Sequence, residues 1–173
     1  TMGANNLTIS TDSNLALAVG ANLTGTGNLI ITSTTAATTI GIAGGAGTLN
    51  LTSTELGQIT DGWTSIIIGN SAGTGTMNVS ARTWNDALTL RSATGQMNIN
   101  GTQTMGANNL TISSDSNINI GANLTGTGVL TISSNAIATT MAVGTGQTGT
   151  IQIDSTELGR ITDGWGNIIF GQT

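Results

Sequence analysis

The sequence predicts an all-β fold, a right-handed parallel β-helix (β-solenoid) with about 20 residues per coil and about eight coils. Three observations predict this fold. They are a long internal repeat, many short runs in which apolar and polar residues alternate, and a composition rich in small polar residues with few charges. Repeated units of this kind bury their apolar faces by stacking on one another. The right hand follows from the strong preference of parallel crossovers.

Two long strings of residues occur twice. Residues 53–63 read STELGQITDGW and return at 155–165 as STELGRITDGW. The string TMGANNLTIS occupies residues 1–10 and 104–113, so the offset is 102 residues in the first case and 103 in the second. We therefore interpret residues 1–103 as a first β-solenoid repeat unit. Residues 104–173 form a partial second unit, continuous with the first in a single solenoid domain.

Strands are predicted wherever apolar residues alternate with polar ones, because this is the period of a strand. A first type, usually after Gly or Asn and before Ser or Thr, has apolar pairs at Leu7/Ile9, Leu29/Ile31, Leu49/Leu51, Met77/Val79, Met97/Ile99, Leu110/Ile112, Leu130/Ile132 and Ile151/Ile153. A second type, close to a following Gly, has them at Leu17/Val19, Ile40/Ile42, Ile66/Ile68, Leu88/Leu90, Ile118/Ile120, Met141/Val143 and Ile168/Phe170. Met2/Ala4 and Met105/Ala107 resemble short members of the second type.

First-type strands start 22, 20, 28, 20, 13, 20 and 21 residues apart, and the first five steps make one 103-residue unit. Each step is interpreted as one coil, so a unit has five coils. The 13-residue step is interpreted as a two-strand coil. An antiparallel meander is the competing interpretation, but it predicts two-residue turns, and only Asn100-Gly101 has the Asn-Gly signature of such turns. The absence of Pro also fits strands with neighbours on both sides.

The long 28-residue step contains residues 53–64, which we expect to leave the wall as a ledge, as does their copy at residues 155–166. We call residues 53–64 the first ledge and residues 155–166 the second ledge. We expect them to share one conformation on one side of the rod, five coils or about 24 Å apart. Their candidate ligand-binding residues are Glu55, Asp61, Trp63, Glu157, Asp163 and Trp165.

Two chemistries are considered for these ledges. A Trp beside carboxylates suits a glycan platform, although the indole is as well explained by covering the wall of the solenoid. Calcium at Glu55 and Asp61 is the second, against the simpler interpretation that Asp61-Gly62 makes a turn by bonding its own backbone. We favour the structural interpretation in both cases, so neither a metal nor a cofactor is predicted.

Composition excludes several functions. Only 6% of residues are charged, against roughly 25% in a typical domain. With three basic residues and a net charge of −5, a nucleic-acid interface is not expected. No apolar run approaches the roughly 20 residues of a membrane-spanning helix, so no membrane insertion is predicted.

No enzyme is predicted, because the chain has neither His nor Cys and its candidate carboxylate pair recurs with the structural repeat. The expected outward positions, nine residues in all, are too mixed for the regular array of an ice-binding surface. They are Thr8, Ile30, Asn50, Asn78, Thr89, Asn98, Thr111, Thr131 and Gln152.

Three strings carry a resemblance to a known family. They are TTIGIAGGAGTLNLTSTEL at residues 38–56, ITDGWTSIIIGNSAGTGTMNV at 59–79 and TWNDALTL at 83–90. The pattern resembles the repeat regions of large bacterial exoproteins of the filamentous-haemagglutinin type, and is most similar to β-strand-repeat surface proteins of cyanobacteria and other Gram-negative bacteria. The resemblance implies a secreted structural section of a surface fibre or adhesin stalk.

The expected location is therefore extracellular, at the cell surface. The expected partners are further copies of the same repeat, either in one long chain or as axial neighbours in a filament. The alternative function is a glycan-binding adhesin module that uses the Trp-bearing ledges, and its partners are surface glycans.

Overall fold

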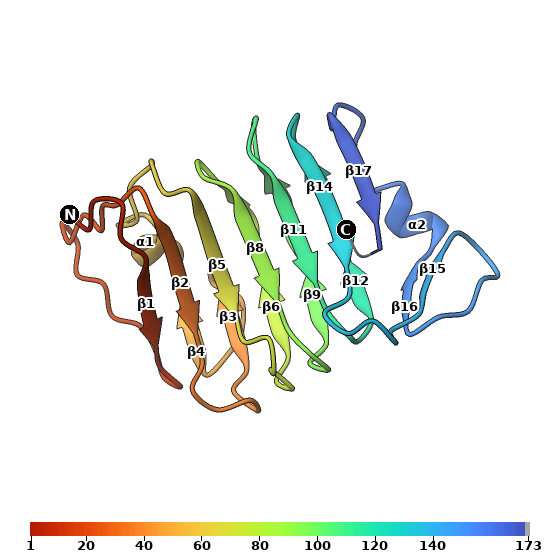
Figure 1. The fold of residues 1–173 in the computed structure, drawn as a ribbon, viewed down its shortest axis with the longest axis horizontal. Coiled ribbons are helices and arrows are strands. Elements are labelled where there is room, and N and C mark those ends of the chain that lie inside the picture. Colours follow the sequence, from red (N-terminus) through yellow and green to blue (C-terminus); the bar gives the residue numbers. More distant parts are fainter. Residues whose placement is uncertain (172–173) are drawn as a thin grey trace.

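A computed structural model of the chain describes residues 1–171, which form mostly β-strands with two short helices (Figure 1). Every strand pair among these residues is parallel. The all-β, parallel fold class is confirmed, and the antiparallel meander is wrong. Since parallel neighbours need a crossover between them, the chain must travel away from each sheet before it returns.

The largest sheet has seven strands and is called the long sheet. Its strands follow one another in chain order, as Figure 1 shows from N to C. They are β1 (Leu7–Ser10), β2 (Asn28–Thr32), β5 (Ser65–Gly69), β8 (Leu88–Arg91), β11 (Leu110–Ser113), β14 (Val129–Ser133) and β17 (Asn167–Phe170).

Ten shorter strands form the other sheets. A five-stranded sheet contains, in spatial order, β12 (Ile118–Ile120), β9 (Met97–Ile99), β6 (Met77–Val79), β3 (Ile40–Ile42) and β4 (Leu49–Leu51). A three-stranded sheet contains β13 (Leu124–Thr125), β10 (Gln103–Thr104) and β7 (Arg82–Thr83), and a two-stranded sheet contains β15 (Met141–Val143) and β16 (Ile151–Ile153). Helix α1 (Ser53–Leu56) follows β4, and helix α2 (Ser155–Leu158) follows β16.

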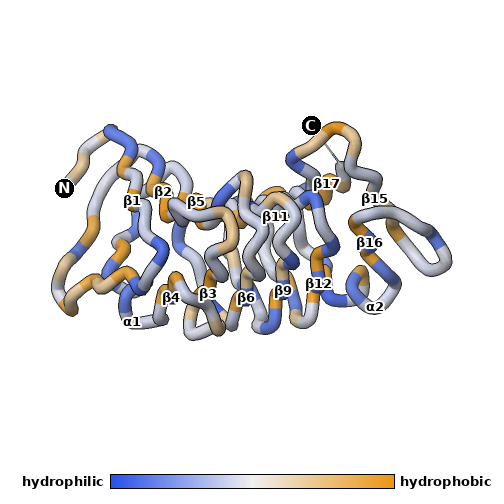
Figure 2. Tube along the Cα trace, turned by 90° about the horizontal axis from the view of Figure 1, so that it is seen from below, coloured by the Kyte–Doolittle hydropathy of each residue, from blue (hydrophilic) through white to orange (hydrophobic). Residues whose placement is uncertain are grey.

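The chain visits these sheets in a fixed order. After β5 it forms β6 in the five-stranded sheet and β7 in the three-stranded sheet, and then returns to the long sheet as β8. We call each such route, up to and including the long-sheet strand to which the chain returns, a passage. The next two passages, through β9 and β10 and through β12 and β13, repeat this order. Figure 2 shows the long sheet and the five-stranded sheet as two opposite layers along the molecule.

The passages differ in length from the predicted ones. Register partners in the long sheet lie 22, 37, 22, 22, 20 and 38 residues apart from β1 to β17. Four of these six steps are near the predicted 20 residues. The first four steps span the 103 residues from Leu7 to Leu110, so a repeat unit has four passages rather than five.

The extra predicted coil has a local cause. Strands β3 and β4 were counted as belonging to successive coils, but they pair with each other across a return of nine residues, Ile40 to Leu49. Gly45 and Gly47 make this return compact, because a Cβ there would lie 2.1 Å from Asn78 O or Gly41 N. The predicted two-strand coil is also wrong, since β9 and β11 lie in different sheets.

The core lies between the sheets and is built from stacked columns of like residues. In the long sheet, partners of Leu29 along one column are Ile66, Leu88, Leu110, Leu130 and Ile168. The neighbouring column contains Ile31, Ile68, Leu90, Ile112, Ile132 and Phe170. Most members are fully buried, and alternation along each strand produces this arrangement. Ile132 therefore has like residues on both sides, as predicted, whereas Leu51 has only Ile42, because β4 is an edge strand.

The outward positions separate into two sets, one on each sheet. On the long sheet the central column contains Thr8, Ile30, Ile67, Thr89, Thr111, Thr131 and Ile169. On the five-stranded sheet the central column is Asn119, Asn98, Asn78, Gly41 and Asn50. Asn98 Nδ2 donates to Asn78 Oδ1 at 3.0 Å, so the asparagines form part of a ladder. The mixture of Asn with Thr expected from the sequence arose because strands of both sheets were assigned to one wall, whereas Thr and Ile still occur together in the long-sheet column.

Three predicted strands are absent. Residues 14–19 lack strand structure and Val19 is 82% exposed, although their counterpart in the second unit is β12. Strand β12 is held by β9, and no described strand takes that place beside residues 14–19. The runs at Met2/Ala4 and Met105/Ala107 contain Gly3 and Gly106, whose φ angles of 57° and 56° turn the chain.

Candidate functional site: the two ledges

Each ledge begins with a one-turn helix that is closed by the same reciprocal pair of hydrogen bonds. At α1, Glu55 N donates to Thr52 Oγ1 at 3.2 Å, and Thr52 N donates to Glu55 Oε2 at 2.9 Å. At α2, Glu157 N donates to Asp154 Oδ1 at 2.9 Å, and Asp154 N donates to Glu157 Oε2 at 3.0 Å. This capping box satisfies backbone donors that a helix end leaves free. Glu55 and Glu157 therefore act as helix caps.

The remainder of each ledge is tied to one carbonyl of the preceding passage. Leu23 O accepts from Thr60 N at 3.1 Å and from Trp63 Nε1 at 3.4 Å. In the second ledge Leu124 O accepts from Thr162 N at 3.1 Å and from Trp165 Nε1 at 3.2 Å. The prediction that the two ledges share one conformation is met by these matching bonds.

Both indoles lie on a glycine of the wall. A Cβ on Gly25 would lie 2.4 Å from Trp63 Cη2, and a Cβ on Gly126 would lie 2.8 Å from Trp165 Cη2. Only a residue without a side chain leaves room for this contact. The indoles thus cover the wall, which is the simpler of the two roles expected for them. Trp63 is only 3% exposed and Trp165 is partly buried, so the first ledge presents no open aromatic face to a sugar.

The acidic residues that follow differ in their contacts. Asp61 and Asp163 are both exposed. In the second ledge Gly164 N donates to Asp163 Oδ1 at 2.9 Å, a bond of Asp to its own backbone like the one that was expected at Asp61-Gly62. In the first ledge the equivalent Gly62 N donates to Asp86 Oδ1 at 2.9 Å, from the following passage.

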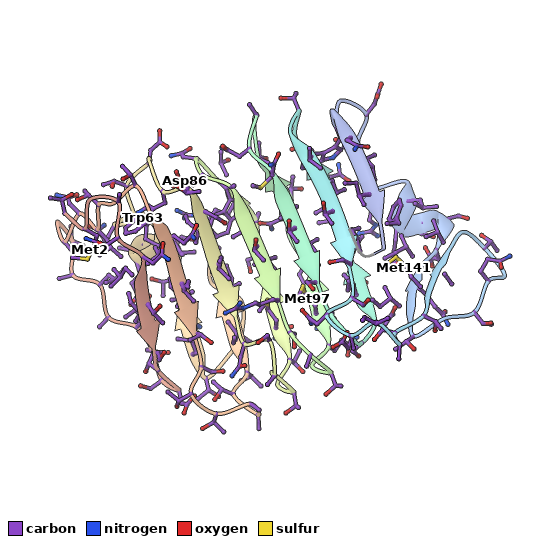
Figure 3. All side chains as sticks on the ribbon, in the orientation of Figure 1. Met2, Trp63, Asp86, Met97 and Met141 are labelled. Carbon is purple, nitrogen blue, oxygen red and sulfur yellow. The ribbon has the colours of Figure 1, made fainter. Side chains whose placement is uncertain are left out.

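Asp86 is thus a part of the first ledge that sequence reasoning did not assign to it. It lies 24 residues after Gly62 in the chain but directly beside it in space, and Figure 3 places Asp86 near Trp63 at the end where the long-sheet strands begin. Burial raises the pKa of the Asp86 carboxyl, and the nearby Asp61 carboxylate raises it further. No sequence spacing points to this contact, because it depends on the length of the intervening passage.

A second unassigned group lies in the three-stranded sheet. The Arg82 guanidinium is 5.1 Å from the centroid of the Trp84 ring, and its Nη2 donates to Leu56 O at 2.8 Å. Trp84 is buried, and its Nε1 donates to the side chain of the buried Gln103 at 2.9 Å. Burial lowers the pKa of Arg82. Arg82 therefore links its passage to the end of α1 by a hydrogen bond, while its guanidinium lies over the indole of Trp84 in the same passage.

A third group clamps the corner at the other end of the long-sheet strands. The Asp12 carboxylate accepts from the backbone N–H and the hydroxyl of both Thr34 and Thr35, and from the hydroxyl of Thr38. These bonds hold the pKa of Asp12 well below its usual range. Asp115 repeats the arrangement with Asn135 N, Ala136 N and Thr139 Oγ1. The recurrence of Asp before Ser at both places was the available sequence signal.

Within residues 1–171, no three acidic, His or Cys side chains converge to hold a metal ion. In the same part of the chain, no helix has the length and apolar character needed to cross a bilayer. The six candidate ligand-binding residues thus lie in three pairs of matching positions, with one member of each pair in each ledge. Their assignment to a ligand stays a prediction.

Comparison with known proteins finds no matching family model, no matching curated protein and no matching solved structure. The resemblance to repeats of the filamentous-haemagglutinin type therefore stays a prediction based on the residues quoted for it.

Proposed function

We propose that the chain winds as a right-handed parallel β-helix, with the long, five-stranded and three-stranded sheets as its walls. The constant order in which the chain visits these sheets supports the winding. In Figure 1 the long-sheet strands run downward in front while the chain advances from left to right, and the strands of the five-stranded sheet lie behind. A path that descends in front and rises behind as it advances to the right has a right hand, the usual hand of parallel crossovers.

We propose further that this winding serves as a structural section of an extracellular bacterial surface fibre or adhesin stalk. The observation that carries the proposal is the continuity of the buried columns across both units, from Leu29 to Ile168 and from Ile31 to Phe170. Each passage contacts its neighbours, so stability grows by adding passages and the molecule lengthens without a new core. The function of such a chain is length and stiffness.

Tandem chains of residues 1–103, with two, four and six copies, test the proposal. Each added unit contributes four strand spacings, so the maximum dimension from small-angle X-ray scattering should grow by about 19 Å per unit at constant cross-section. The matched control replaces the buried Ile31 and Leu90 by Asp in every copy, which should abolish the regular increase. A compact particle whose cross-section grows with copy number would contradict the proposed rod.

The proposed location needs a separate test in the source cells. An antibody against the first ledge should label intact, unpermeabilised cells, and external protease should remove the signal. A cytoplasmic protein measured in parallel must stay unlabelled. Labelling that requires permeabilisation would contradict an extracellular fibre while leaving the proposed rod intact.

A further inference from the structure

The C-terminal end of the described chain presents apolar positions whose counterparts in the first unit are buried. Ile168 in β17 is 41% exposed, whereas its counterpart Ile66 in β5 is 4% exposed. Val143 in β15 is 38% exposed, whereas its counterpart Ile42 in β3 is fully buried. These two differences occur on opposite walls, so a single missing neighbour on one sheet does not explain both.

In the first unit one continuous passage covers both positions. Strand β6 pairs with β3 in the register Ile42 to Val79, and β8 pairs with β5 in the register Ile66 to Leu88. The same passage supplies Asp86, whose Oδ1 accepts from Gly62 N. In the second unit Gly164 N instead donates to the adjacent Asp163. Among the described residues, β17 pairs only with β14 and β15 only with β16.

We propose that the combined edge of β15, β17 and the second ledge is a docking surface for a further copy of the passage formed by residues 70–92. The incoming segment adds a β6-type strand to β15 and a β8-type strand to β17, both parallel. Its two inward leucines then cover Ile168 and Phe170, and its Asp replaces Asp163 as the acceptor for Gly164 N. This inference rests on the proposed function, since it names the partner that extends the rod.

The chemistry selects this passage over other strands of the chain. Strand β1 and strand β11 carry Asn5 and Asn108 where β8 carries Asp86, two residues before the first inward leucine. A neutral amide forms a weaker bond with a backbone N–H than a carboxylate does. Direct stacking of β17 on β1 of a second copy would also pair a β5-type strand with a β11-type strand, a contact that is absent from the described long sheet.

A synthetic peptide of residues 70–92 with a fluorescent label tests the proposal against the 173-residue protein. We expect saturable binding by fluorescence anisotropy, with hydrogen-exchange protection at Met141–Val143 and Asn167–Phe170 and none at Leu7–Ser10. The matched control is the peptide of residues 93–114, which carries strands β9, β10 and β11 and has Asn108 at the position of Asp86. The affinity of this control peptide should be lower by a factor of about ten or more, because it lacks one charge-assisted hydrogen bond.

Variants distinguish specific binding at this edge from non-specific hydrophobic binding. The Asp86→Ala peptide should bind about tenfold more weakly, and the Leu88→Asp/Leu90→Asp peptide should not bind. In the protein, Ile168→Asp should abolish binding, whereas Val19→Asp, at an exposed apolar residue away from this edge, should leave it unchanged. Absence of binding at millimolar peptide, equal binding of both peptides, or protection confined to β1 would each overturn the proposal. Growth of the tandem chains in length would be unaffected by those outcomes.

Discussion

The two ledges have nearly the same sequence but different surroundings. Both have a capping box, a left-handed glycine and an indole bonded to a carbonyl of the preceding passage. Among the described residues, only the first ledge is covered by a following passage, which supplies Asp86 and buries Ile66. The shared features depend on the ledge and the passage before it, and the different ones depend on the passage after it. Local sequence therefore determines conformation here, whereas the following neighbour determines burial.

The largest expected difference is between the two tryptophans. Trp63→Ala should destabilise the protein by about 3–5 kcal/mol, because it removes a buried indole that fills the space over Gly25. Trp165→Ala should cost about half as much, since part of that indole already contacts solvent. Urea unfolding followed by circular dichroism measures both. Equal losses would show that burial of Trp63 by the following passage contributes nothing to the free energy of unfolding.

The next difference is between two isoleucines at one position of the repeat. Ile66→Ala should cost about 2–4 kcal/mol, and Ile168→Ala at most about 1 kcal/mol, because the second side chain has less buried area to lose. The same urea series provides the measurement. Thr111→Ala on the outer face is the control and should change the unfolding free energy by less than about 0.5 kcal/mol. A loss at Thr111 as large as that at Ile66 would mean that the faces of the long sheet are wrongly assigned.

The capping boxes should behave alike, unlike the core positions. Thr52→Ala and Asp154→Ala each remove the side-chain acceptor for the third helical N–H and should cost about 1 kcal/mol. The expected equality follows because the same two bonds, between the residue before the helix and its third residue, close both helices. Hydrogen exchange at Glu55 N and Glu157 N reports each cap separately. A cost confined to one ledge would show that its neighbour, and not the local box, holds the helix.

Much of the fold could be predicted from the sequence, because alternation and repetition act over short distances. Leu29 and Ile31, for example, lie inward as the alternating pattern requires. The number of passages in a unit was wrong because alternation does not identify the sheet that a strand joins. Strand β4 looks like the start of a new passage, yet it pairs with β3 after a return of nine residues. The close backbone approaches at Gly45 and Gly47 are what distinguish a short return to β3 from the start of a new passage.

The candidate site at the ledges was predicted only in part, because the sequence pattern reports short-range features and not contacts between passages. The ledges and the covering role of their indoles could be predicted from the repeated string. The contact of Asp86 with the first ledge could not, because no sequence pattern near Asp86 indicates it. Its contact with Gly62 depends on the register in which β5 pairs with β8, with Ile66 opposite Leu88. The corrected unit also changes the expected separation of the ledges from five coils to four strand spacings, about 19 Å.

The smallest expected effect is a change in pH dependence at Asp86. The pKa of Asp86 is raised in the folded protein, so the folded state binds a proton before the unfolded state as pH falls. Stability should therefore rise, relative to the Asp86→Asn variant, as pH falls through the raised pKa toward the ordinary value of 3.8. Below that ordinary value the difference should become constant. Urea midpoints of both proteins between about pH 7 and pH 3 provide the measurement.

Asp12 offers the control with the opposite sign. Its pKa is lowered by the hydroxyls and N–H groups of Thr34 and Thr35, so its stabilising effect is present above the ordinary carboxyl pKa. The wild-type protein should therefore lose stability relative to Asp12→Asn as pH falls through that range, while it gains stability relative to Asp86→Asn. Two difference curves with the same sign would contradict the assignment. Since only the first ledge has an Asp86, such a result would also remove the electrostatic part of the contrast between the ledges and leave burial alone to explain it.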